Sequence, residues 1–310
     1  MTRTEQLRQF EELRPLLFSI AYRILSSVSE AEDAVQETWL RWESSETTPD
    51  SVKAYLSAVV TRVSINVLNS AKVRREKYVG PWFPEPLLDD PFQDPERSAE
   101  LADSVSMASL LLLERLSALE RAVFVLREVF GYDYDDIAAA VGRSEAACRQ
   151  LAARARRHMD AGRPRFEADR RERELLADRF FDAFKHGQVE ELRELLAADV
   201  SMVSDGGGKA PQWGAGIVGA ENVARLLASL VAPFHRVGGA VELRSVNGQP
   251  GAVFRDRDGK VVNTMALDIA EGQVQTIRAV INPDKLGHVG PVADARDVLR
   301  RTQKARSDTD

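Results

Sequence analysis

A proline-rich stretch is the strongest constraint on how this chain can fold. Gly80–Glu100, GPWFPEPLLDDPFQDPERSAE, contains five prolines, and the sequences on both sides of it have helical patterns. Proline lacks an amide hydrogen and clashes with the preceding helical turn, so this stretch cannot be the interior of a helix. The chain therefore divides into separate modules, and residues 80–104 are expected to form a linker between two of them.

The composition of this linker is unusual in two ways. Seven acidic residues lie between Glu85 and Asp103, against the single basic residue Arg97. Trp82 and Phe83 are large apolar side chains, which a fully solvated linker would not need. We therefore expect the linker to dock on a surface of the protein.

The region before the linker is predicted to be entirely helical. Phe10, Leu13 and Leu17 recur at helical spacing in a first helix. Ser29, followed by Glu32, has the pattern of a capping box and predicts the start of a second helix, which ends near Trp42. A long third helix with a basic end is expected from about Val52 to Tyr78.

The region after the linker has the pattern of a helix-turn-helix. A short helix at Tyr134–Val141 is followed by Gly142, and a longer helix begins near its expected N-cap, Ser144. Ile137, Ala138 and Val141 are expected to pack against Ala147 and Leu151. The alternative is a solvated helical pair that has a basic face and does not bind DNA.

The distribution of charge favours DNA binding more than the net charge does. The formal net charge is −6, which is not typical of a nucleic-acid-binding protein. However, seven arginines lie between Gly142 and Arg165, against Glu145 and Asp160. A basic block therefore follows the acidic linker, and the second helix of the pair could contact bases and phosphates.

The last part of the chain is predicted to be α+β. Two helices, at about Arg173–His186 and Val189–Leu196, precede a strand in DVSMVSD, and a further helix is expected near Gly219–Val231. Four strand-like segments follow, separated by the turns Asn247-Gly248, Asp258-Gly259 and Glu271-Gly272. Such two-residue turns indicate an antiparallel meander. Residues 292–310 are highly charged and are expected to be a mobile tail.

The segment Asp205–Lys209, DGGGK, resembles a phosphate-binding loop but does not match one. A P-loop needs Ser or Thr after its lysine and a glycine five residues before its second glycine, and this chain has Ala210 and Val203 there. No cofactor is therefore expected. Because glycine adopts positive φ and allows close approach of backbones, these glycines indicate a tight contact instead.

The sequence offers few candidates for catalysis. Asp205, His235 and Asp268 could line a pocket of the α+β region, but no catalytic triad and no metal-ligand cluster is recognisable. We therefore do not expect an enzyme. Cys148, the only cysteine, excludes an internal disulfide, and it is expected to be a small buried residue. The chain has no apolar run long enough to span a membrane and no recognisable signal peptide, which suits the cytoplasm.

The first half resembles a bacterial sigma factor of the extracytoplasmic-function (ECF) type. The resemblance rests on EAEDAVQETWLRW (Glu30–Trp42), the long basic-ended helix, the acidic linker and the helix-turn-helix. It implies that one helix contacts the clamp helices of core RNA polymerase through Asp33, Gln36, Glu37, Trp39 and Arg41. The downstream promoter element would be contacted by Arg62, Asn66, Lys72, Arg74 and Arg75. The upstream promoter element would be contacted by Arg143, Ser144, Arg149, Gln150 and Arg154.

The second half resembles a SnoaL-like domain of the NTF2-like superfamily, in which a bent sheet curls around helices and encloses a cavity. Three motifs are similar to those of ECF sigma factors that carry such an extension: WFPEP (Trp82–Pro86), DGGGK (Asp205–Lys209) and NPDKL (Asn282–Leu286). The resemblance implies that the extension regulates the sigma factor in cis. It also implies that Trp82, Phe83, Pro84, Glu85, Pro86, Asp205, Gly206, Gly207, Gly208, Lys209, Asn282, Pro283, Asp284, Lys285 and Leu286 form regulatory contacts.

These observations define the expected organisation: a multidomain protein with two all-α sigma modules, the second a helix-turn-helix, followed by an α+β SnoaL/NTF2-like cone domain. The expected parts are a region-2-like domain at 1–79, the linker at 80–104, a region-4-like domain at 105–162, the SnoaL-like domain at 170–291 and the tail at 292–310.

The resemblance also predicts the partners. They are core RNA polymerase, through its beta-prime clamp helices and beta flap, promoter DNA, and the chain's own SnoaL-like domain; an unidentified small molecule is a further candidate. Two alternatives remain: an isomerase- or cyclase-like enzyme domain fused to a DNA-binding half, and a ligand-sensing regulator that acts without polymerase. EAEDAVQETWLRW favours the sigma factor, because a stand-alone regulator would not need it.

Overall fold

The protein consists of two compact units that do not follow the expected linker boundaries. The computed structural model describes residues 2–76, 78–92, 98–162, 170–210 and 216–307, except the side chains at 71–76, 98–100, 162, 170 and 305–307. The first unit comprises Met1–Lys77 and Asp90–Arg163, and the second comprises Tyr78–Asp89 and Pro164–Asp310. The expected linker at 80–104 is therefore divided between the units, and its last residues form helix α4 (Ser98–Ser104).

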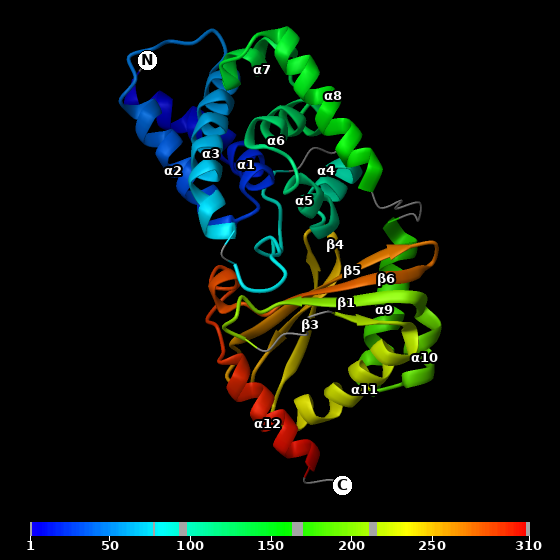
Figure 1. Ribbon diagram of the computed structural model, residues 1–310. Coiled ribbons are helices and arrows are strands. Elements are labelled where there is room, and N and C mark those ends of the chain that lie inside the picture. Colours follow the sequence, from blue (N-terminus) through cyan, green and yellow to red (C-terminus); the bar gives the residue numbers. More distant parts are fainter. Residues whose placement is uncertain (1, 77, 93–97, 163–169, 211–215, 308–310) are drawn as a thin grey trace. The chain divides into compact units, whose positions relative to one another are not determined.

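The first unit begins with three helices that pack on one another (Figure 1). They are α1 (Arg3–Leu25), α2 (Val28–Glu43) and α3 (Val52–Glu76). Leu17, Ile20 and Leu56 are completely buried between them. Trp42 is also buried, and its indole Nε1 donates to the carbonyl of Gln6 at 3.4 Å.

The start of α2 differs from the prediction. Ser27, rather than Ser29, is the N-cap, and its Oγ accepts from the amide of Glu30 at 3.1 Å. The cause lies in the turn before it: Ser26 adopts a left-handed conformation with φ of 58° and ends α1. The chain then enters Ser27 in an extended conformation, which is the geometry that an N-cap requires.

The rest of the first unit contains the predicted helix-turn-helix. After α5 (Met107–Leu113), helix α6 (Ala118–Phe124) continues into a π-helical turn, η1 (Val125–Val129). Helices α7 (Tyr134–Val141) and α8 (Glu145–Gly162) follow. The turn between them is as predicted: Gly142 has φ of 65°, and Ser144 Oγ accepts from the amide of Ala147 at 3.3 Å.

The inward face of α7 is shifted slightly from the prediction. Ile137 and Ala140 are the buried residues of this helix, whereas Ala138 and Val141 are only partly buried. On α8, Leu151 is buried and Ala147 is partly buried. Ala140 is buried because α7 packs against α3 as well as against α8, so two sides of this short helix are covered.

The second unit is built on a six-stranded sheet in the order β2-β1-β6-β5-β4-β3. The chain enters it through α9 (Arg170–His186) and α10 (Val189–Leu195), then forms β1 (Leu196–Asp205) and β2 (Ile217–Val218). Helix α11 (Ala220–Arg236) leads to the meander of β3 (Ala240–Val246), β4 (Gln249–Arg255), β5 (Val261–Ala270) and β6 (Gln273–Val280). The meander is antiparallel as predicted, and β1 pairs with β6 in parallel.

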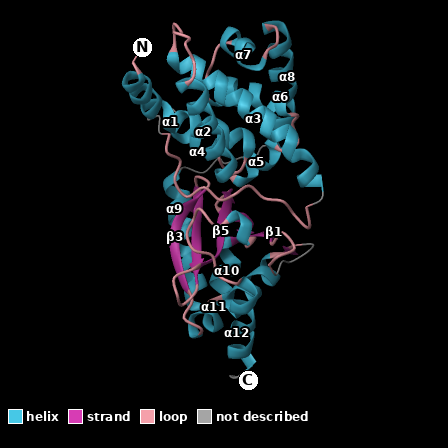
Figure 2. Ribbon diagram, turned by 90° about the vertical axis from the view of Figure 1, so that its left-hand side faces the viewer, coloured by secondary structure: helices cyan, strands magenta, loops and turns pink. Residues whose placement is uncertain are grey.

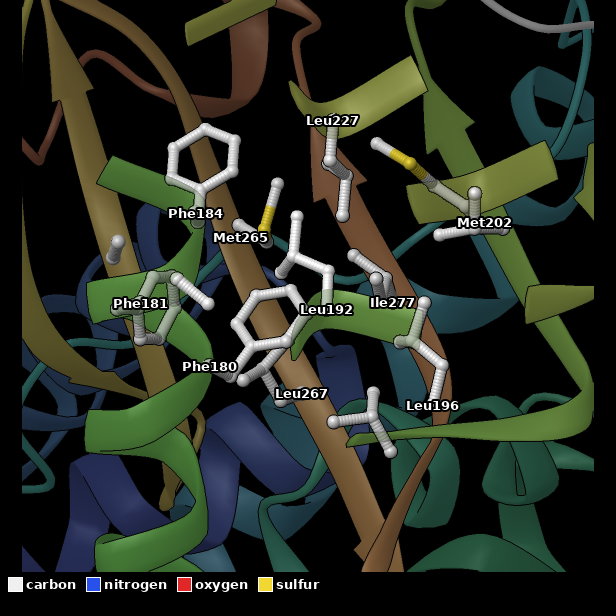
Figure 3. Close-up of a cluster of buried hydrophobic side chains, with 14 of the residues drawn as sticks. Phe180, Phe181, Phe184, Leu192, Leu196, Met202, Leu227, Met265, Leu267 and Ile277 are labelled. Carbon is white, nitrogen blue, oxygen red and sulfur yellow. The ribbon is translucent and has the colours of Figure 1, made fainter. Parts of the chain in front are cut away.

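The sheet is bent, and the helices cover one of its faces (Figure 2). Register shifts interrupt the pairing between Leu196 and Ser201 and between Asp268 and Ile269, where such irregularities bend a strand. The core lies between the helices and the concave face of the sheet. In Figure 3, Phe180 and Phe184 of α9 lie close to Met265 and Leu267 of β5. This arrangement is the expected α+β cone.

The end of the chain differs from the expected mobile tail. After a 3-10 turn, η2 (Pro283–Lys285), helix α12 (Ala295–Ser307) packs against α11 and β5. Val298 and Thr302 of this helix are buried. The many charges of the segment hid this pattern, because its arginines and Asp297 occupy the outer side of an amphipathic helix.

Candidate functional site

The outer face of α2 carries the residues that were predicted to contact polymerase. Asp33, Gln36 and Arg41 are exposed, whereas Glu37 and Trp39 are partly buried. Glu37 accepts from Arg41 at 2.8 Å, and the Trp39 ring packs against Phe10 with 5.1 Å between centroids. Three of these five side chains are therefore open to solvent, and Trp39 is held against α1.

Two apolar residues of α2 have contrasting surroundings. Trp42, the last residue of EAEDAVQETWLRW, is completely buried and belongs to the core. Leu40, which was not singled out, is 52% exposed on the accessible side. The helical spacing of the buried Val35, Thr38 and Trp42 could have revealed this exposed apolar side chain next to Arg41.

Arg62 of α3 is bound to the helix-turn-helix. Its Nε donates to the carbonyl of Ala140, and its Nη2 donates to the carbonyl of Ala139, both at 3.0 Å. These carbonyls lie in the last turn of α7, where a cation is favoured by the helix dipole. Asn66, one turn further along α3, is exposed. The side chains of Lys72, Arg74 and Arg75 lie outside the described residues.

A second contact joins α3 to the residues just before α7. The hydroxyls of Ser57 and Tyr132 are hydrogen-bonded at 2.7 Å, and the Lys53 ammonium lies 5.9 Å from the centre of the Tyr132 ring. Burial raises the pKa of Tyr132. Ser57 and Arg62 of α3 are thus both hydrogen-bonded to the helix-turn-helix region.

Helix α8 and the two residues before it present to solvent the side chains that were predicted to contact the upstream promoter element. Arg143, Ser144, Arg149, Gln150 and Arg154 are all exposed. Arg149 is held in place: Glu145 accepts from it at 2.9 Å, and its guanidinium lies 4.9 Å from the centre of the Tyr134 ring. Arg127 lies at the same distance from that ring.

Arg154 and Cys148 show how α8 is held in the first unit. Arg154 is paired with Glu120 at 3.1 Å, which joins α8 to α6. Cys148 is completely buried, and burial raises the pKa of its thiol. Because the thiolate is the reactive form, this supports the interpretation of Cys148 as a packing residue.

The motifs WFPEP, DGGGK and NPDKL meet in the second unit, at the carboxylate of Asp205. This residue is completely buried at the end of β1. Its Oδ2 accepts from the amide of Phe83 at 2.9 Å and from Nζ of Lys285 at 2.8 Å. Its Oδ1 accepts from the hydroxyl of Tyr78 at 2.5 Å and from the amide of Gly207 at 3.0 Å. We call the contacts of residues 78–87 with Asp205, Asn247, Asn282, Lys285 and His288 the linker clamp.

Lys285 is the second centre of the linker clamp. Besides Asp205, its ammonium donates to the carbonyl of Phe83 at 2.5 Å. It also lies 4.6 Å from the centre of the Tyr78 ring and 4.3 Å from that of Trp82. A buried ammonium is stable only when hydrogen bonds and charge compensate it, and here the linker supplies much of that compensation.

The glycines of DGGGK allow the backbone to approach the clamp. Gly207 has φ of 57°, and a Cβ there would lie 2.3 Å from Nδ2 of Asn282 and 2.9 Å from the hydroxyl of Tyr78. Gly208 has φ of 70° and packs against Val79. Asn282 in turn donates to the hydroxyl of Tyr78 at 2.7 Å. Any side chain at Gly207 would therefore displace the residues that hold the linker.

The clamp extends beyond WFPEP. The amide of Leu87 donates to Oδ1 of Asn247 at 3.1 Å, and the amide of Asn247 donates to the carbonyl of Leu87 at 2.7 Å. His288 Nε2 is within 2.6 Å of the carbonyl of Pro86. Phe83 and Leu87 are buried. Residues 78–87 are therefore docked on the C-terminal domain, as the aromatic residues of the linker predicted. At the rim, Lys209 and Asp284 form an exposed ion pair at 2.6 Å.

The three residues considered for catalysis do not form one site. Asp205 belongs to the linker clamp, and His235 Nδ1 is 3.0 Å from the carbonyl of Gly239 near the end of α11. Asp268 is paired with Arg278 at 2.8 Å, and its burial raises its pKa. None of the three lines the cavity of about 390 Å³ beside α11. Within the described part of the chain, no group of three or more potential metal ligands occurs.

Comparison with known proteins agrees with this division into modules. Residues 9–74, which span α1 to α3, match Sigma-70 region 2, and residues 107–159, which span α5 to α8, match Sigma-70, region 4. The ECF RNA polymerase sigma factor SigJ of Mycobacterium tuberculosis is 35% identical over 294 residues, which cover 90% of this chain and 93% of the relative. The probable ECF sigma factor SigI of the same species is 29% identical, over 88% of this chain and 92% of its own.

The fold is shared as well. The crystal structure of Mycobacterium tuberculosis SigJ superposes with a TM-score of 0.71 and 31% identity, covering 93% of this chain and all of the other. The two helical modules thus define a transcription initiation factor. The chain belongs to the family of ECF RNA polymerase sigma factors. Among the residues that the structure describes, no helix has the length and hydropathy to cross a membrane.

Proposed function

We propose that this sigma factor directs core RNA polymerase to specific promoters in the cytoplasm, and that its own C-terminal domain regulates it in cis through the linker. The observation that carries the regulatory part is the linker clamp. Asp205 and Lys285 are buried, yet several of their hydrogen bonds go to Tyr78 and Phe83, which lie between the two sigma regions in the sequence. A linker that served only as a spacer would not satisfy the buried charges of another domain.

The contacts with polymerase and promoter follow from the exposed faces of the first unit. The accessible side of α2, with Asp33, Trp39 and Arg41, binds the beta-prime clamp helices, and Leu40 adds an apolar contact. The first turns of α8 contact the bases of the upstream promoter element, and its later arginines contact phosphates. The beta flap is the expected partner of region 4.

The free protein is in a restrained state. Arg62, the expected contact of the downstream element, is occupied by the carbonyls of Ala139 and Ala140. Strand opening needs polar side chains that hold unstacked bases, so α3 has to release α7 before Arg62 can contribute. The restrained and released states need to differ by only a few kcal/mol for partners to shift the balance.

The clamp favours the restrained state because it shortens the usable linker. Residues 78–87 are fixed on the C-terminal domain and cannot extend when the two sigma regions separate. Releasing them adds length and freedom to the connection between α3 and α4. Release of the clamp therefore favours the geometry in which both promoter elements can be bound.

Replacement of Lys285 tests this mechanism. In Lys285→Met, the Asp205 carboxylate keeps three donors, from Tyr78, Phe83 and Gly207, so the domain should remain folded. We expect faster hydrogen exchange at the Phe83 amide and higher transcription in vitro with core polymerase on a cognate promoter. Lys260→Met, at an exposed lysine of the same domain, is the matched control. Faster exchange without any change of transcription would contradict regulation through the linker.

A further inference from the structure

The C-terminal domain contains a cavity of about 390 Å³ that the linker clamp does not use. Its floor is the concave side of the sheet, with Met202, Phe254 and Met265. Leu227 and Leu230 of α11 form one wall. The residues that cover it from the other side, Val298 and Leu299 among them, come from α12.

The chemistry of the lining restricts what could bind. None of the lining residues is ionisable, and the largest are Phe, Met and Leu. The hydroxyls of Ser229 and Thr302 donate to carbonyls of their own helices, so they offer the cavity little polarity. Asn263 and Gln303 are the remaining side chains of the lining that carry polar groups, and both are uncharged amides. A charged ligand would lose its hydration there without compensation, whereas a neutral apolar one would not.

Two contacts connect this cavity to the linker clamp. Ile281 lines the cavity, and its amide donates to the carbonyl of Asp205 at 2.8 Å; the next residue, Asn282, binds Tyr78. At the start of α12, Arg296 Nη2 donates to the carbonyl of Gly208 at 3.2 Å. The helix that covers the cavity is thus hydrogen-bonded to the same DGGGK loop that packs against the linker.

We propose that this cavity is an effector site for a neutral, largely apolar small molecule, and that its occupation alters the linker clamp through α12 and Ile281–Asn282. A ligand that fills the space between the sheet and α12 acts on both contacts at once. Binding to the cavity is independent of the proposed regulation, whereas the coupling to the clamp rests on it.

Binding can be tested with Nile red, a neutral fused-ring dye, on the full chain. We expect saturable binding, seen as a rise in dye fluorescence. Leu230→Trp, which fills the cavity from a partly exposed position, should weaken binding at least tenfold, whereas Ala232→Trp on the exposed side of α11 should not. Thermal melts verify that both variants are folded. Absence of saturable binding, or equal binding by a folded Leu230→Trp variant, would overturn the proposal.

Coupling needs a separate readout. Hydrogen exchange at the Phe83 amide should differ at least threefold between the free and the dye-saturated protein. Arg296→Ala should reduce that difference while leaving dye affinity unchanged, because Arg296 lies outside the cavity lining. Saturable binding with unaltered exchange at Phe83 would refute the coupling. A Lys285→Met variant with unchanged transcription would instead refute the regulation itself, so the two failures are distinguishable.

Discussion

At the scale of single residues, Asp205 shows how a buried carboxylate can be structural rather than catalytic. It has no exposed surface, and four donors from Tyr78, Phe83, Gly207 and Lys285 surround it. A general base needs a lone pair directed at a substrate, and these donors occupy both oxygens. The residue that looked like a catalytic candidate in the sequence therefore holds the linker.

Removal of this carboxylate should be costly. In Asp205→Ala, the Lys285 ammonium stays buried without its charged partner, and breaking such a pair typically destabilises a protein by about 3–5 kcal/mol. Denaturant unfolding of the full chain measures the loss. Asp199→Ala, at an exposed position of the same strand, should change stability by about 0.5 kcal/mol or less. Similar values for both variants would contradict the role of the pair.

We propose that Tyr134 positions Arg149 on α8, the helix that is expected to contact the upstream promoter element. The guanidinium groups of Arg127 and Arg149 each lie 4.9 Å from the centre of the Tyr134 ring. Tyr134→Leu should leave Arg149 less ordered and weaken binding to a cognate upstream element about three- to tenfold more than binding to unrelated DNA. The dependence of the DNA affinity on salt concentration should stay unchanged, because no phosphate contact is removed.

Arg157→Ala provides the contrast to Tyr134→Leu. Arg157 is exposed on α8 and is one of its later arginines, which are proposed to contact phosphates. Its replacement should weaken binding to both kinds of DNA about equally. The slope of the logarithm of the affinity against the logarithm of the salt concentration should decrease in magnitude by about one. If Tyr134→Leu behaved in the same way as Arg157→Ala, the positioning role would be wrong.

At the scale of secondary-structure elements, the start of α2 gives a direct test of the capping geometry. Ser27→Ala removes the hydroxyl that accepts from the Glu30 amide and should destabilise the helical module by about 1 kcal/mol. Ser29→Ala lies inside the helix and should have a smaller effect. Thermal unfolding of the two variants, compared side by side, shows which serine is the N-cap of α2.

Local signals explain which elements could be predicted. The turns Asn247-Gly248 and Glu271-Gly272 have positive φ at both residues, and the helix-turn-helix carries a glycine and an N-cap serine at fixed spacing. These features depend on neighbours in the sequence. The first residue of α2 could not be predicted from neighbouring residues, because Ser27 and Ser29 both precede a glutamate by three residues. Only the conformation of Ser26 distinguishes the two serines.

The candidate site was predictable only in part, for the same reason. Family resemblance indicated that WFPEP, DGGGK and NPDKL form contacts, but the pairing of Tyr78 with Asp205 joins residues far apart in the sequence. The hydrogen bonds from Arg62 to carbonyls of α7 were not predicted. The sequence pattern of an exposed arginine on a helix is the same whether the side chain binds DNA or a carbonyl. Helix α12 was missed because its charges concealed a narrow apolar stripe.

At the scale of the whole molecule, deletion of residues 170–310 tests the role of the extension. This removes Asp205, Asn282 and Lys285 together and leaves residues 78–87 without their partners. If the linker clamp restrains the sigma factor, transcription in vitro should change in the same direction as with Lys285→Met. An opposite change, in a truncated protein that still binds core polymerase, would show that the extension acts by another route.

Carrying the clamp on the same polypeptide has a consequence for gene dosage. A separate inhibitor must be made in proportion to its target, and any imbalance in synthesis alters the fraction of target that is free. Here each linker meets its partner at a fixed effective concentration, which depends on the chain and not on the amount of protein. If the clamp restrains the sigma factor, the fraction of released molecules should therefore be independent of expression level, and making more of the chain should raise output without changing that fraction.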